Sequence, residues 1–373
     1  MNDTYEPVRS PDYDYLLKSP ESSVVVCEEP TQQPDLNERH ELAKLLRGQQ
    51  VRISDLHSIL QGWPEAINID LPALRIDVDK IMDNLFPPGK QRFKLKAADL
   101  GLFGAMWWPY ASPERLRIST SLAMWLFVWD DEFDSLDFSD LGTKFEEAQA
   151  YRATSLQHIH MSLALDCPIP DGYKNATLSE IHASILESFT PIGLAMVKDC
   201  TLDQRRALMR ELDFYIKMTE LEQRVQLDGN LPSVASYMRR RMGSGAVGVL
   251  VAVHEYALGI RLPQPIINSP SMKSLWDETN VNICIINDIF SMKKEVALNL
   301  VDTLIPLLFI AHERNLQAAM DAAAGMLRDS VARFDLAAKA LLAENAGDEL
   351  VAADLAKFID SCRYACTANL NFS

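Results

Sequence analysis

The 373-residue sequence lacks the patterns that mark several classes of protein. Its six cysteines are scattered and form no CxxC pair, so neither a disulfide framework nor a zinc site is predicted. No basic run is longer than the three arginines 239–241, and the formal net charge is -16. A nucleic-acid partner is not expected, because a phosphate backbone requires clustered positive charge. An anionic substrate would need metal ions as intermediaries.

Long apolar segments are missing as well. The longest apolar runs, around 246–253 and 304–310, are shorter than the roughly 20 residues that span a bilayer. The N-terminus is polar and acidic, where a secretory signal would be basic and then apolar. We therefore expect a cytoplasmic protein that does not insert into membranes and whose thiols are reduced and buried.

Strand-like alternation of polar and apolar residues is also absent, and from residue 39 onward apolar residues recur at threes and fours. This period is typical of helices. Turn sequences at 87–89, 112–114, 169–172, 230–232 and 262–265 leave helix-length segments between them. Residues 1–38 are rich in Pro, Ser and acidic residues, which predicts a flexible N-terminal arm. Residues 39–373 are expected to form one all-α domain.

Two polar clusters interrupt this apolar helical sequence. Asp130 and Asp134 lie four residues apart, and Asn287, Ser291 and Glu295 follow one another at steps of four. Four residues are about one helical turn, so each set lines up on one helix face. Either set alone has the ordinary interpretation of a solvated helix face. Together they predict a magnesium site, because Mg²⁺ prefers oxygen ligands.

Basic and hydroxyl groups that suit a phosphate lie elsewhere in the chain. Arginine binds phosphate oxygens with a planar fork, lysine acts as a point charge, and tyrosine donates a hydrogen bond. The candidates are Arg241, Lys294, Arg363 and Tyr364. Glycine and serine follow Arg241 directly, and such pairs can kink a helix.

These motifs resemble those of class I terpene cyclases, and most closely those of fungal sesquiterpene synthases. The segment WDDEFD at 129–134 matches the aspartate-rich motif of that family, and NDIFSMKKE at 287–295 matches its NDxxSxxKE motif. SCRY at 361–364 is similar to the family's Arg-Tyr pair, and VRISDL at 51–56 to its opening motif. Arg241 precedes Asn287 at the spacing of the family's diphosphate-sensing arginine.

The resemblance implies a single-domain helical bundle around a central apolar cavity. Three Mg²⁺ ions would be held by Asp130, Asp134, Asn287, Ser291 and Glu295. Arg241, Lys294, Arg363 and Tyr364 would bind the diphosphate, and Gly245 would lie at the family's helix break, whose exposed carbonyl assists ionisation. The implied reaction is ionisation of farnesyl diphosphate and cyclisation to a cyclic, in particular polycyclic, sesquiterpene hydrocarbon or alcohol. The family forms monomers or weak homodimers.

An aromatic wall would stabilise the carbocation. Phe127 lies three residues before Asp130, so it is expected to point into the cavity, as the matching aromatic of the family does. Weaker candidates, for which core packing is the favoured explanation, are Phe103, Trp107, Trp108 and Phe290. The released diphosphate can take the final proton, so no histidine is assigned as a base.

Three alternatives stay open at this point. The substrate could be geranyl or geranylgeranyl diphosphate instead of farnesyl diphosphate. A chain-elongating prenyl diphosphate synthase has a similar fold but carries two aspartate-rich motifs, and this sequence has one. A non-catalytic protein that binds isoprenoid diphosphate would be expected to have lost a ligand, and none is missing.

Overall fold

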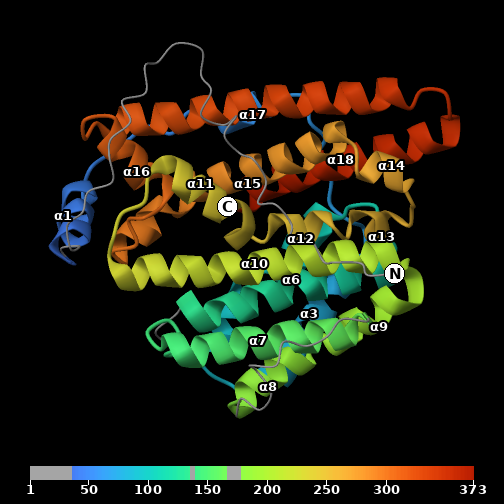
Figure 1. The fold of residues 1–373 in the computed structure, drawn as a ribbon, viewed down its shortest axis with the longest axis horizontal. Helices are drawn as coiled ribbons and strands as arrows, with labels where there is room; N and C mark the ends of the chain where they lie inside the picture. Colours follow the sequence, from blue (N-terminus) through green and yellow to red (C-terminus); the bar gives the residue numbers. More distant parts are fainter. Residues whose placement is uncertain (1–35, 135–138, 166–177) are drawn as a thin grey trace, which may run out of the picture.

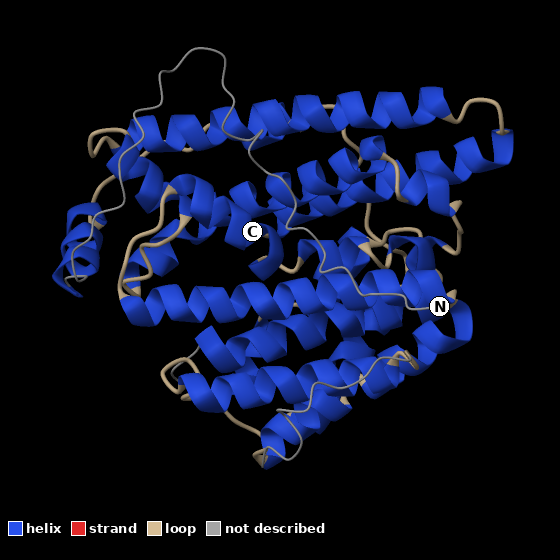
Figure 2. Cartoon of the chain, viewed as in Figure 1, coloured by secondary structure: helices blue, strands red, loops and turns tan. Residues whose placement is uncertain are grey.

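The computed structural model describes residues 36–134, 139–165 and 178–373, and these residues form helices and no strand (Figure 2). The all-α fold class expected from the sequence is confirmed. The helices of the described residues are α1 Leu36–Leu46, α2 Leu56–Ile59, α3 Leu71–Leu85, α4 Lys90–Ala97, α5 Leu100–Trp107, α6 Pro113–Asp134, α7 Phe145–Ser162, α8 Glu180–Glu187, α9 Thr190–Asp199, α10 Leu202–Asp228, α11 Val234–Ser244, α12 Val247–Val251, α13 His254–Leu258, α14 Gln264–Ile267, α15 Pro270–Ala297, α16 Leu304–Ala311, α17 Leu316–Glu344 and α18 Glu349–Phe372.

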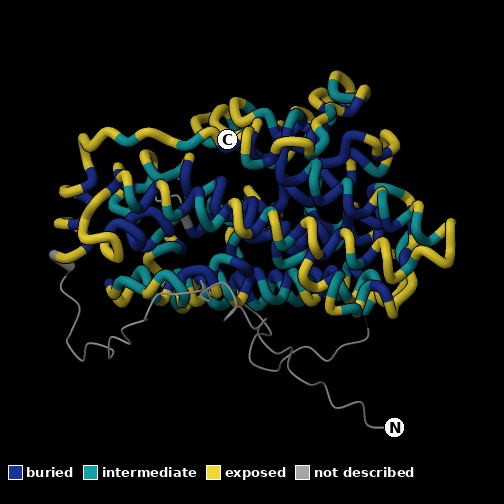
Figure 3. The backbone as a smooth tube through the Cα atoms, turned by 90° about the horizontal axis from the view of Figure 1, so that it is seen from above, coloured by how far each residue is buried: buried dark blue, intermediate teal, exposed yellow. Residues whose placement is uncertain are grey.

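Helix α15 lies in the middle of the bundle, between α17 and α18 and the break between α11 and α12 (Figure 1). It is buried on nearly all sides between residues 278 and 289. A helix that is buried around most of its circumference has neighbours on every side. Buried residues accordingly fill the interior of the molecule, and the exposed residues lie around it (Figure 3).

Local sequence signals explain where several helices begin and end. Ser269 caps α15 by accepting from the Met272 amide, with proline at the first helical position. Thr201 and Gln204 form a capping box at the start of α10, and Gly229 ends the same helix at φ 75°. The expected turns at 87–89 and 230–232 lie between helices, whereas those at 112–114 and 262–265 run into the first residues of α6 and α14. The turn expected at 169–172 falls outside the described residues.

The C-terminal ends of α6, α10 and α15 lie at the same end of the bundle, where α1 also packs (Figure 1). Helix α1 begins at residue 36, slightly before the boundary expected at 38, and residues 1–35 lie outside the described part. No helix among the described residues is both long and apolar enough to cross a membrane.

Candidate active site

Asp130 occupies the last turn of α6 and faces α10. The hydroxyl of Tyr215, on α10, donates to Asp130 Oδ1 at 3.0 Å. Asp134 ends the same helix, but its side chain lies outside the described residues. Phe127 is one turn earlier on α6, so Asp130 and the exposed aromatic share a helix face.

The other two acids of the cluster point to different neighbours. Asp131 forms an ion pair with Lys94 of α4 at 3.2 Å. Glu132, which is buried, lies 3.1 Å from His182 Nε2 of α8. Tertiary contacts therefore separate the three acids whose side chains are described, and of these Asp130 alone faces Tyr215 of α10.

The second motif lies on one face of α15. Ser291 Oγ donates to Glu295 Oε1 at 2.7 Å. Arg241 Nη2 donates to Asn287 Oδ1 at 2.7 Å. The same guanidinium lies 3.1 Å from Asp288 Oδ1. The neighbouring helix α11 thus supplies a cation to the turn of α15 that carries the first predicted metal ligand.

Arg241 connects the two motifs. Burial raises the pKa of Asp130 to about 7, and the charge of Glu222 adds to the rise, while the Tyr215 hydrogen bond and the charge of Arg241 oppose it. Arg241 is therefore close enough to Asp130 to act on it electrostatically while it is bonded to Asn287. The end of α6 and the end of α15 face one polar site.

The oxygen-bearing side chains of the two motifs fit a hard cation. Burial raises the pKa of Glu295 to about 7, and the charge of Asp288 adds to the rise. The charge of Arg241 only partly compensates the two motif carboxylates whose pKa is about 7, and a divalent cation would supply further positive charge. Among the described residues no three His, Cys, Asp or Glu side chains cluster as metal ligands, so Asn287 and Ser291 are needed to complete the set.

The polypeptide breaks between α11 and α12 directly after Arg241. Gly245 caps α11, and Ala246 has φ 55°, a left-handed conformation that costs a non-glycine residue about 1 kcal/mol. A Cβ on Gly245 would lie 2.9 Å from Cys284 Sγ and 3.0 Å from the Arg241 carbonyl oxygen. The break is therefore packed closely against α15, and only glycine leaves room for it.

Within the part of the chain that the structure describes, the other three predicted diphosphate ligands form no hydrogen bond or ion pair with Arg241 or with the predicted metal ligands. Lys294 is exposed in the last turn of α15. Arg363 pairs with Asp335 at 3.2 Å and with Asp360 at 3.0 Å. The Tyr364 hydroxyl lies 3.4 Å from that of Tyr110. The diphosphate-binding roles of these three residues stay predictions.

An aromatic group begins next to the polar site. Phe127 is 43% exposed within an otherwise buried stretch of α6, and its ring meets that of Phe103 edge to face at 5.4 Å. Phe103 stacks on Trp107 at 5.0 Å and meets Phe372 at 5.4 Å. Of the other candidates, Trp108 is buried and Phe290 is 39% exposed.

Sequence reasoning missed the contribution of α10. Tyr215 bonds Asp130, and Glu222 acts on both Asp130 and Arg241. The two residues are seven positions apart, which is two helical turns, so they share a face. That spacing in an amphipathic helix is a signal that could have identified them.

Comparisons with known proteins identify the family of the chain. The family model described as terpene synthase family 2, C-terminal metal binding, matches residues 121–333. Sesquiterpene cyclase hepA of Aspergillus oryzae is 33% identical over 341 residues, which is 91% of each chain. Terpene cyclase braA of Annulohypoxylon truncatum is 24% identical and covers 91% of this chain and 88% of its own.

Solved structures share the fold. Hedycaryol synthase in complex with HEPES superposes with a TM-score of 0.69 at 18% identity and covers 87% of this chain and 98% of its own. A variant of cucumene synthase gives a TM-score of 0.67 at 18% identity and covers 83% of this chain and 96% of its own.

The chain therefore belongs to the terpene synthase family. It is a class I terpene cyclase that resembles fungal sesquiterpene synthases, as the motifs indicated.

Proposed function

We propose that this cyclase ionises farnesyl diphosphate with the help of Mg²⁺ and closes the carbon chain to a cyclic, in particular polycyclic, sesquiterpene hydrocarbon or alcohol. The observation that carries the proposal is the position of Arg241, which bonds Asn287 of α15 and acts on Asp130 of α6. The relatives named sesquiterpene cyclase and sesquiterpene synthase support the length of the substrate.

Asp130, Asn287, Ser291 and Glu295, together with Asp134, would hold the metal, with three ions expected from the family resemblance. Bound Mg²⁺ would neutralise the charge that develops on the leaving diphosphate. Arg241 presents guanidinium donors at the same place and is fixed by Asp288, so it can bind diphosphate oxygens bidentately. Lys294, Arg363 and Tyr364 are proposed as further ligands.

The apolar side of the site would protect the cation. The exposed face of Phe127 adjoins Phe103, and aromatic faces stabilise positive charge by about 0.5 to 2 kcal/mol each. Exclusion of water prevents quenching before ring closure. His254 is no candidate for the final base, because complete burial lowers its pKa to about 3, so the released diphosphate is proposed as the acceptor.

We also propose that residues 39–373 act as one catalytic domain, as a cytoplasmic monomer or weak homodimer. The first test is incubation of purified protein with farnesyl diphosphate, with and without Mg²⁺, followed by gas chromatography and mass spectrometry of the organic extract. A cyclic C15 product that requires Mg²⁺ is expected. Turnover of only the C10 or C20 diphosphate would correct the substrate, and binding without turnover would contradict the cyclase reaction.

A further inference from the structure

A buried acid outside the metal motifs binds two arginines from distant parts of the chain. Asp302, in the link between α15 and α16, is 2% exposed. Its Oδ1 lies 3.2 Å from Nη1 of Arg39, on α1, and its Oδ2 lies 3.3 Å from Nη2 of Arg240, on α11. Removing one member of a buried ion pair leaves an uncompensated charge, so the three side chains depend on one another.

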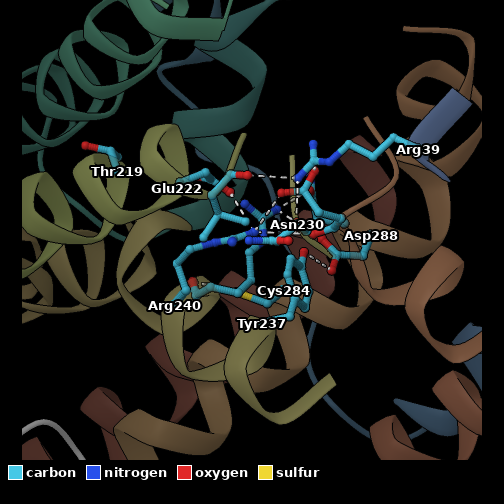
Figure 4. Close-up of polar contacts among 12 residues, drawn as sticks. Arg39, Thr219, Glu222, Asn230, Tyr237, Arg240, Cys284 and Asp288 are labelled. Carbon is cyan, nitrogen blue, oxygen red and sulfur yellow. Dashed lines mark hydrogen bonds and ion pairs between the residues drawn. The ribbon is translucent and has the colours of Figure 1, made fainter. Parts of the chain in front are cut away.

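The ion-paired cluster of Arg39, Asp302 and Arg240 is connected to the active site through Glu222. Arg240 Nη2 lies 3.6 Å from Glu222 Oε1, and the charge of Glu222 acts on both Asp130 and Arg241. Figure 4 shows Arg39, Arg240 and Glu222 with the polar contacts among the residues drawn. The path runs from α1, through Asp302 and Arg240, to the carboxylate that faces the proposed diphosphate end.

Arg39 also binds the end of the helix that carries Glu222. Its Nε donates to the Gly229 carbonyl at 3.0 Å, and its Nη2 donates to the carbonyls of Val225 and Asn230 at 3.1 and 3.0 Å. The last carbonyls of a helix have no partner within it, and a cation is favourable there. Arg39 therefore caps α10 and holds Asp302 at the same time.

Arg47, which directly follows α1, binds the C-terminal end of α15 in a similar manner. Arg47 Nη2 donates to the carbonyls of Val296 and Ala297 at 3.2 and 3.3 Å, and to Asn299 Oδ1 at 2.8 Å. These carbonyls directly follow the predicted ligand Glu295. Helix α1 and the residue that follows it thus join the C-terminal ends of α10 and α15, which carry opposite sides of the polar site.

We propose that Arg39 is a positioning residue for the diphosphate end of the site. It acts through Asp302 and Arg240 on Glu222, and by capping α10 it sets the distance of Glu222 from Asp130 and Arg241. It does not touch substrate. The inference rests on the proposed function, because it concerns how the same site binds a magnesium–diphosphate complex.

The test compares Arg39→Gln and Arg39→Lys with a matched control. Arg333→Gln removes another arginine that pairs with a buried acid, Glu278, at 2.6 Å. That pair joins α17 to α15 more than two turns before Asn287. The substitution Arg333→Gln therefore perturbs α15 away from the polar end. The measurements are melting temperature, calorimetric affinity for inorganic pyrophosphate with Mg²⁺, and kcat and KM for farnesyl diphosphate.

We expect Arg39→Gln to weaken pyrophosphate binding by about tenfold, the lower range for loss of a group that orients metal ligands, and to raise KM more than it lowers kcat. Arg39→Lys keeps the charge but cannot reach all the carbonyls, so an intermediate loss is expected. Arg333→Gln is expected to lower the melting temperature without changing pyrophosphate affinity.

Hydrogen exchange of the metal-free proteins gives a readout that needs no turnover. Faster exchange at 225–230 and 296–302 is expected in both Arg39 variants and not in the control. If Arg39→Gln does not fold, the lysine variant decides the outcome. Wild-type affinity and exchange in a folded Arg39 variant would overturn this inference alone. A wild-type protein that neither binds pyrophosphate nor converts farnesyl diphosphate would overturn the proposed function first.

Discussion

The guanidinium of Arg241 donates to the side-chain oxygen of Asn287 at 2.7 Å. The acceptor is the oxygen that is proposed to bind metal, so Arg241 and a metal ion would compete for it. The Arg241 nitrogen that donates, Nη2, also lies 3.1 Å from Asp288 Oδ1. Binding of a metal–diphosphate complex would therefore replace Arg241 by a metal ion as the positive partner of Asn287. The N–H donors of Arg241 would then be available to the diphosphate.

Asn287→Ala is expected to reduce turnover of farnesyl diphosphate by roughly two to three orders of magnitude, the scale for loss of a group that stabilises developing charge. Asp130→Ala should behave alike. Both residues are partly exposed, so helical content and solubility should stay near wild type. Product analysis measures the loss of turnover, and circular dichroism measures the helical content. A fully active variant would refute the metal assignment.

Metal binding should depend on pH. Burial raises the pKa of Asp130 and of Glu295 to about 7, and metal ligation requires their ionised forms. Affinity for Mg²⁺ should therefore rise between about pH 6 and about pH 8. The Mg²⁺-induced increase in melting temperature measures it, and an increase that is independent of pH would contradict the assignment.

The stability of the metal-free protein should change in the opposite direction. The folded protein binds more protons than the unfolded chain when an acid has a raised pKa, so the free energy of unfolding falls as pH rises to about 7. Burial also raises the pKa of Glu211 to about 7, although Glu211 is in neither motif. Glu211→Gln should reduce this fall and leave the pH dependence of Mg²⁺ binding unchanged, which thermal unfolding can test.

Gly245→Ala tests the helix break. The added methyl group would meet Cys284 Sγ and the Arg241 carbonyl, so α11 and Arg241 must shift away from α15. Turnover should fall by at least about tenfold, because small displacements of positioning groups are costly. Gly325→Ala in α17 is the control, since its Cβ would meet nothing within 4 Å. Equal activities of the two variants would show that the close contact is unimportant.

Phe127→Leu should change the products more than the stability. The side chain is 43% exposed, so unfolding should be nearly unaffected, whereas loss of an aromatic face removes about 0.5 to 2 kcal/mol of cation stabilisation. We expect diphosphate release to continue while acyclic or differently cyclised products increase. An unchanged product spectrum would place Phe127 outside the cavity wall.

The sequence by itself determined the helical class, most turn positions, and the family through its motifs. These properties depend on neighbours within one or two turns: the four-residue steps of Asn287, Ser291 and Glu295, or the serine and proline that begin α15. Local spacing is preserved whenever the segment becomes helical, so it can be interpreted without knowledge of the rest of the chain.

Only the tertiary structure decided which polar groups meet. Asp130, Asp131 and Glu132 are adjacent in sequence, yet they face α10, α4 and α8 in turn. Arg39 contacts Asp302 across 263 positions, and no periodic pattern reports such a contact. The partner of a charged side chain depends on how helices pack, which is set by the apolar faces of the whole bundle and not by the residues next to the charge.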